Sequence, residues 1–222
     1  MTALLRYQCA LLLRSQRWLP PVILYGAFLA IGVQSGQPVL DSLAYAAAAL
    51  LPVAAWLVRI CATNEPDAAR SCTAAAAGPG RAHLACLLAA LFSAAALGAA
   101  GTVVVTAISD ASDIDHRVDL NRFAAGAAGL LAMLVSALLG TAIGALTNRP
   151  LLRSPGRSVP AMLIVALLAL VTVGSPARVA LTQLTTGSRD GVVPVPLLPL
   201  AGAAAAAALA TWAACALSAR RG

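Results

Sequence analysis

The chain has 222 residues, of which 60% are hydrophobic and 10% charged, whereas soluble domains carry about 25% charged residues. This composition excludes an ordinary water-soluble protein, and the length accommodates one membrane domain built from spans of about 20 apolar residues. The formal charge of +7 comes from arginine alone, and the arginines lack the aromatic interleaving or basic stripe of a nucleic-acid interface.

Residues 1–18 have the pattern of an amphipathic helix. At about 100° per residue, Arg6, Arg14 and Arg17 fall on one half of the helix. The other half carries Leu4, Leu5, Tyr7, Leu11, Leu12 and Trp18. Three residues break the division, namely Gln8, Leu13 and Ser15. We expect this segment to lie in the membrane interface, the alternative being that it extends the first span. With no small-residue cleavage site after a short apolar core, we expect no cleaved signal peptide.

Six apolar runs follow, and together they predict an all-α membrane domain over residues 19–218 with a short tail at 219–222. The expected transmembrane helices are 19–36, 40–60, 83–108, 123–147, 158–174 and 194–218. Pro20 and Pro21 mark the turn from the interfacial helix into the first span. The fifth span is the shortest of the six.

The arginines predict the orientation of these spans, because short translocated loops exclude positive charge. Eleven of the 15 lie on one side, at Arg6, Arg14, Arg17, Arg59, Arg70, Arg81, Arg149, Arg153, Arg157, Arg220 and Arg221. The other side has Arg117, Arg122, Arg178 and Arg189. We therefore expect a multi-pass protein of the inner or plasma membrane with both termini in the cytoplasm. All five cysteines then map to the cytoplasmic side, where thiols stay reduced.

The segment after the second span predicts a short cytoplasmic helix at about 65–77. Asn64 is a candidate cap, Pro66 lies near the first helical position, Asp67 lies in the first turn, and Gly78-Pro79-Gly80 ends the helix. The sequence EPDAARSCTAAAA is too short and too polar at its start to span a membrane. An incidental surface helix is the alternative interpretation.

A second short helix is expected on the outer side, before the last span. Ser175 is its candidate cap, Pro176 lies in its first turn, and Gly187 is its candidate stop, which gives a helix at about 176–186. The helix would re-enter the membrane or lie on its outer surface.

No catalytic residue is nominated. The sequence lacks the phosphate-binding motif GxxxxGK[ST], and without lysine the chain cannot form that ATP site. The outer stretch DASDIDHRVDLN gathers acidic side chains that an alternative interpretation would use for a metal-dependent or enzymatic function. It lacks the glycine and terminal glutamate of a calcium loop, and Arg117 and Arg122 accompany it, so we expect a solvated loop and no metal site.

The interiors of the expected spans contain no ionisable residue. Carriers that use an ion gradient usually need such groups near mid-membrane, so energy for transport would come from a partner. The scattered polar residues that could line a substrate pathway are Gln34, Ser35, Thr102, Thr106, Ser136 and Thr141. Gly140 and Gly144 form a GxxxG pattern, for which packing within the chain is favoured over a dimer contact.

This layout resembles the membrane subunits of type 2 ABC exporters. The features that carry the resemblance are the interfacial helix, six spans with inward termini, the inner helix before the third span, and the irregular outer segment before the sixth. In that family the inner helix couples the permease to its ATPase, which implies that role for Glu65, Asp67 and Arg70. The run GPGRAHLACLL is similar to the family's return into its third span.

The resemblance implies a permease that exports an apolar or amphipathic substrate, such as a drug, natural product, lipid or peptide. Its partners would be a separate ATP-binding subunit, a second permease subunit and membrane lipids, with no nucleic acid. ATP and magnesium would bind the partner, and this chain would hold no cofactor and would not be an enzyme by itself. The alternatives are a membrane-embedded enzyme or metal-dependent factor, and an accessory or immunity protein.

Overall fold

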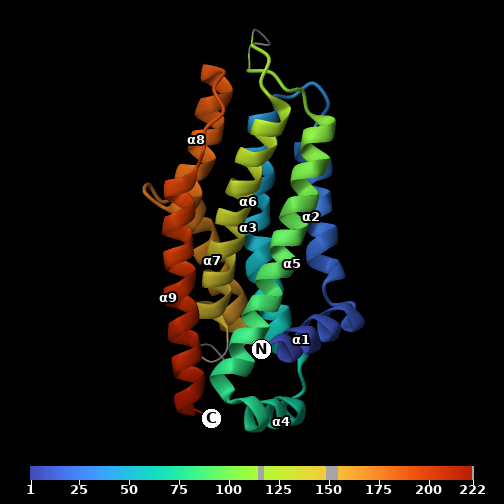
Figure 1. Cartoon of the computed structure of the whole chain (residues 1–222), viewed down its shortest axis with the longest axis vertical. Coiled ribbons are helices and arrows are strands. Elements are labelled where there is room, and N and C mark those ends of the chain that lie inside the picture. Colours follow the sequence, from blue (N-terminus) through green and yellow to red (C-terminus); the bar gives the residue numbers. More distant parts are fainter. Residues whose placement is uncertain (115–117, 149–154, 222) are drawn as a thin grey trace.

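The computed structural model describes residues 1–114, 118–148 and 155–221 (Figure 1). These residues form nine helices and no strand beyond two isolated bridges. The helices are α1 (Thr2–Ser15), α2 (Leu19–Gly32), α3 (Val39–Asn64), α4 (Asp67–Ala77), α5 (Pro79–Ile108), α6 (Arg122–Thr147), α7 (Pro155–Val171), α8 (Pro176–Asp190) and α9 (Leu197–Arg221). The prediction of an all-α fold is confirmed.

Four helices are long and apolar enough to cross a membrane, namely α3, α5, α6 and α9. A fifth span is formed if α7 and α8, which meet at a bend of 44°, count as one broken crossing. The first expected span is a helix of 14 residues, α2, which at 1.5 Å per residue measures about 21 Å against a hydrocarbon core of about 30 Å. The structure therefore establishes a membrane-type helical bundle of four to five spans, and six spans remain a prediction.

The centre of the bundle is built from α3 and α6, which lie side by side (Figure 1). Gly140 and Gly144 let the two backbones approach closely. A Cβ atom on Gly140 would lie 2.6 Å from the Leu51 carbonyl oxygen, and one on Gly144 would lie 2.6 Å from Val58 Cβ. The GxxxG pattern thus packs within the chain, as predicted.

Tyr25 is the large buried side chain through which α2 reaches this centre. Tyr25 is 1% exposed, and its hydroxyl contacts the Met133 sulfur at 3.6 Å. The hydroxyl end of the Tyr25 ring lies against Gly101 of α5. A Cβ atom on Gly101 would clash with the Tyr25 side chain. The remaining faces of α2, α7 and α9 leave many apolar side chains exposed, which suits a lipid surface.

Three helix ends differ from the predictions. Helix α2 ends at Gly32 and not at 36: Val33 already has extended backbone, at φ −111° and ψ 113°, and the loop that follows it carries Gln34, Ser35 and Gln37. Helix α8 continues past Gly187 to Asp190, and the left-handed residue that ends it is Gly191, at φ 65°. Gly187 is needed inside the helix for close packing and not as a stop. The last helix also continues through the expected tail, to Arg221.

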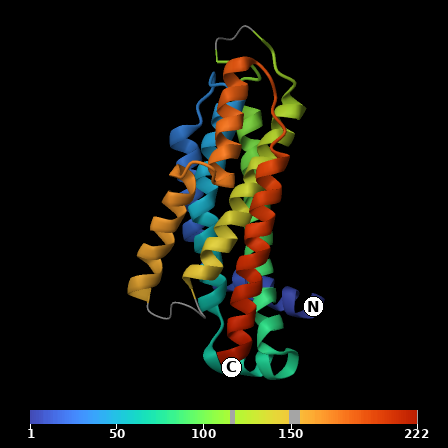
Figure 2. The same ribbon diagram turned by 90° about the vertical axis from the view of Figure 1, so that its left-hand side faces the viewer.

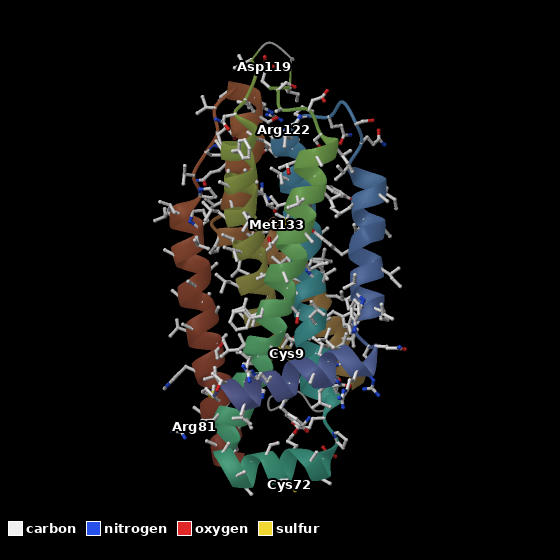
Figure 3. All side chains as sticks on the ribbon, turned by 45° about the vertical axis from the view of Figure 1, so that its right-hand side comes forward. Cys9, Cys72, Arg81, Asp119, Arg122 and Met133 are labelled. Atoms are coloured by element: carbon white, nitrogen blue, oxygen red, sulfur yellow. The ribbon has the colours of Figure 1, made fainter. Side chains whose placement is uncertain are left out.

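The two ends of the bundle differ in structure (Figures 1 and 2). At one end, which we call the α4 end, both chain termini lie near α4, and α1 and α4 run across the direction of the long helices. At the other, the α8 end, lie α8 and the segment before α6. Figure 3 shows Cys72 and Arg81 at the α4 end, and Asp119 and Arg122 at the α8 end.

Candidate functional site at the α4 end

Helix α4 is bounded by residues that cannot continue a helix. Pro66 precedes it with extended backbone, at φ −58° and ψ 146°. Gly78 follows it at φ 87°, a conformation that favours glycine, and Pro79 then opens α5 directly. A short helix is present and ends at Ala77 as expected, but it begins at Asp67, two residues after the expected start, and Asn64 is the last residue of α3 and does not cap α4. Its side-chain amide donates to the Leu11 carbonyl of α1 at 3.1 Å.

Glu65 is the centre of a polar cluster between α1, α3 and α4. Its side chain is 7% exposed. The Tyr7 hydroxyl donates to Oε1 at 3.2 Å, and the Gln8 amide donates to Oε2 at the same distance. The Thr73 hydroxyl donates to Oε1, also at 3.2 Å. Two helices that are far apart in the sequence are thereby tied to one carboxylate.

These hydrogen bonds explain how a carboxylate is accommodated there. Burying a charged group is costly unless it is paired or hydrogen-bonded, and three donors surround Glu65. A tyrosine hydroxyl is protonated at neutral pH in any case, and partial burial and the neighbouring Glu65 carboxylate raise the pKa of Tyr7 further, so it can keep donating as the pH rises. Gln8 is 4% exposed, and removing its acceptor would leave a buried amide unpaired.

Arg70 folds back from α4 onto the end of α3. Its guanidinium donates to the Ala62 carbonyl at 2.6 Å and to the Glu65 carbonyl at 3.4 Å. A cation at a helix C-terminus pairs with carbonyls that have no partner inside the helix. Arg70 also lies 3.9 Å from the carboxylate of Asp67, one turn earlier.

The structure therefore divides the three residues expected to couple to a partner. Glu65 and Arg70 face the body of the protein, whereas Asp67, with its side chain 85% exposed, faces outward. The outward face of α4 also carries small side chains, at Ala68, Ser71, Cys72, Ala75 and Ala76. Cys72 is the exposed member of the five cysteines, all of which lie in the described part of the chain.

Tyr7, Gln8 and Thr73 were not predicted as site residues. Their partner Glu65 is more than 50 residues from the first two, and no local pattern reports such a contact. One signal was present, because Gln8 breaks the amphipathic division of residues 1–18. In the structure Gln8 is buried with Leu12, and these two are the buried residues of α1.

A second polar cluster fixes α7 to the bundle at the same end. The Arg59 guanidinium of α3 donates to Asn148 Oδ1 at 3.1 Å and to Ser158 Oγ at 2.8 Å. Asn148 follows α6, and its amide donates to the Gly144 carbonyl at 2.8 Å. Ser158 and Asn148 are both buried. The cluster joins the ends of three helices without a carboxylate among its described members.

The residues expected to line a substrate pathway do not share one environment. Gln34 and Ser35 are exposed in the loop after α2. Thr102 and Thr141 are buried, and each hydroxyl donates to the carbonyl four residues earlier in its own helix, at 2.9 and 2.7 Å. The remaining two are Thr106, which is bonded to the Thr102 carbonyl, and Ser136, which is buried in α6. A pathway along these residues stays a prediction.

The outer acidic stretch forms part of a folded loop at the α8 end. The Val118 amide donates to Asp113 Oδ1 at 3.1 Å, and the Asp113 amide donates to the Val118 carbonyl at 3.0 Å. Asp110 exchanges backbone hydrogen bonds with Gln37 and Val39. Asp115 and His116 lie outside the described residues. Among the residues that are described, His, Cys, Asp and Glu form no cluster of three suited to a metal ion.

With this geometry in place, comparison with protein-family models, curated proteins and solved structures gives no match.

Proposed function

We propose that this chain is the membrane subunit of an ATP-driven exporter, and that α4 is the surface on which a separate ATP-hydrolysing subunit docks. One observation carries the proposal: α4 lies across the end of the bundle, beyond the long helices (Figure 3). One side of α4 packs against the rest of the chain, and its opposite, outward side is exposed.

The chemistry of that face supports docking over simple solvation. Solvent-facing helix surfaces are normally rich in charged and polar residues. Of the six exposed residues of α4, however, only Asp67 is charged. The others are alanine, serine and cysteine, which let a partner backbone approach closely. A helix with such a face fits the helix-in-groove mode of recognition.

The anchoring of α4 supports the transmission of movement. The Glu65 carboxylate joins it to α1, because it accepts from Thr73 of α4 and from Gln8 of α1. Arg70 ties α4 to the end of α3, and Gly78 links it directly to α5. A displacement of α4 by a partner would therefore move three helices together, as rigid-body transmission requires. ATP and magnesium would bind the partner, and the substrate would be apolar or amphipathic.

The complete transporter would contain a second permease subunit, in the cell inner or plasma membrane with the α4 end in the cytoplasm. The scattered, mostly self-bonded hydroxyl groups of the spans favour a cargo that needs few polar contacts. An accessory or immunity role would use the same bundle without ATP-dependent movement of a substrate. The two proposals differ in whether an ATPase copurifies.

Copurification of tagged protein from mildly solubilised native membranes tests the docking surface. We expect a second chain with a phosphate-binding loop to copurify with the wild type and with Ala75→Ser, which keeps the face small. Ala75→Arg places a long charged side chain on the face and should reduce recovery of that chain at least tenfold. Asp119→Arg changes the charge at the α8 end by +2, against +1 for Ala75→Arg, and should still leave recovery unchanged.

Two results would overturn the proposal. In the first, no ATP-binding chain copurifies with the wild type. In the second, Ala75→Arg and Asp119→Arg retain it equally. Either result would favour a role that does not depend on α4.

A further inference from the structure

A groove of about 610 Å³ lies along the outward side of α8. Helix α8 forms one side, and Val192, Pro194 and Val195 of the segment that returns toward α9 form the other. Figure 2 shows this returning segment descending beside α8. The volume lies within the range of about 300–1,000 Å³ that is typical of ligand sites.

The groove is built into the fold by two glycines. Gly191, at φ 65°, reverses the chain after α8, and the Val192 amide then donates to the Gly187 carbonyl at 3.0 Å. A Cβ atom on Gly187 would lie 2.7 Å from Pro194 Cδ. The returning segment can therefore lie directly on α8 at Gly187 and form the wall of the groove.

The lining combines a polar stripe with an apolar wall. Thr182 and Thr186 are four residues apart and lie on one face of α8, and Gln183 lies beside them. The Oε1 atom of Gln183 is buried without a hydrogen-bond partner among the described residues. Because an unpaired buried amide is unfavourable, this side chain gains from turning toward a ligand that offers an N–H group.

Opposite charges stand at the two ends of the stripe. Arg178 lies near the start of α8, where its guanidinium donates to the Val171 carbonyl at 2.6 Å and keeps further N–H groups for a ligand. Asp190 is the last residue of α8. The two are twelve residues apart, or about 18 Å at 1.5 Å per residue. The helix dipole adds positive potential at the Arg178 end and negative potential at the Asp190 end.

We propose that this groove binds a short zwitterionic peptide of about five residues, extended and antiparallel to α8. At about 3.4 Å per residue, five residues span the distance between the two charges. The peptide carboxylate meets Arg178, the amino group meets Asp190, and the backbone amides meet Gln183, Thr182 and Thr186. The valine and proline wall accepts small branched side chains.

The separation of the charges selects a peptide over a zwitterionic lipid headgroup. A headgroup carries its phosphate and ammonium on neighbouring groups, so it reaches one end of the groove at a time. The proposed site lies at the opposite end of the bundle from α4 and does not depend on the docking of an ATPase.

A ligand-observed NMR titration tests the proposal, with the protein in nanodiscs and the peptide Ala-Val-Thr-Val-Ala as the probe. We expect saturable binding that empty nanodiscs do not give. Arg178→Gln and Asp190→Asn should each weaken it about tenfold, the scale of one charge-assisted contact. Arg189→Gln is the matched control, because this exposed arginine of α8 lies outside the groove lining. The affinity of this variant for the peptide should equal that of the wild-type protein.

Blocked peptides identify which end of the ligand meets which residue. An acetylated amino terminus should remove the effect of Asp190→Asn, and an amidated carboxyl terminus should remove the effect of Arg178→Gln. The proposal is overturned if the pentapeptide shows no saturable binding, if the blocked peptides bind as tightly as the free one, or if a short-chain zwitterionic phospholipid displaces the peptide completely.

Discussion

Glu65 shows how a single residue can define a junction that no local pattern reports. The sequence pattern predicts that it begins a short helix, and the family resemblance implies that it couples to an ATPase. In the structure it is 7% exposed and accepts hydrogen bonds from α1 and α4. Its partners follow from tertiary contact alone, which is why periodicity and capping signals located the helix but not the junction.

Replacing Glu65 should release α1 from the bundle. Glu65→Ala leaves the buried Gln8 amide without its acceptor, and an unsatisfied buried group costs about 1–3 kcal/mol. We expect a lower melting temperature in detergent and faster hydrogen exchange in residues 2–15. Asp67→Ala, which removes an exposed carboxylate two residues away, should change neither quantity measurably. Equal effects of the two variants would show that the Glu65 cluster does not hold α1.

At the scale of elements, the packing of α6 on α3 depends on small residues at the contact. The sequence correctly predicted packing within the chain, because GxxxG is a local pattern that indicates close helix approach, but it did not identify α3 as the partner. It did not predict that α2 would be only 14 residues long, or that α8 would extend to Asp190. Those boundaries depend on where the polar loop and the returning segment pack, which the local sequence does not encode.

Gly140 and Gly126 provide a matched pair on α6. A Cβ atom on Gly140 would lie 2.6 Å from backbone and side-chain atoms of α3, whereas one on Gly126 would lie 3.4 Å from Thr106 Cγ2. Gly140→Ala should destabilise the bundle by about 1–3 kcal/mol through overpacking, and Gly126→Ala should be neutral or slightly stabilising. Denaturation in mixed micelles measures both. If Gly140→Ala instead unfolds no earlier than wild type, the α3–α6 contact is not as close as described.

On the scale of the whole molecule, the bundle presents two chemically different ends. The α4 end carries a small-residue helix held by the Glu65 cluster and by Arg70, and the α8 end carries a groove with separated charges. Composition predicted the membrane character, and the charge distribution predicts that the α4 end faces the cytoplasm, an orientation that stays a prediction. The groove could not be predicted, because it arises where a chain reversal lays residues 191–195 against α8.

The central claim, that the outward face of α4 docks an ATP-hydrolysing subunit, is tested most directly through Cys72, which is exposed on that face. A benzophenone maleimide on Cys72 should, on illumination of native membranes, cross-link the protein to a peripheral chain that has a phosphate-binding loop and hydrolyses ATP. The same reagent on a cysteine introduced at Asp119, in a Cys72→Ser background, should not. Cross-links from Cys72 to lipid or to other copies of this chain alone, with no ATP-hydrolysing partner, would contradict the account.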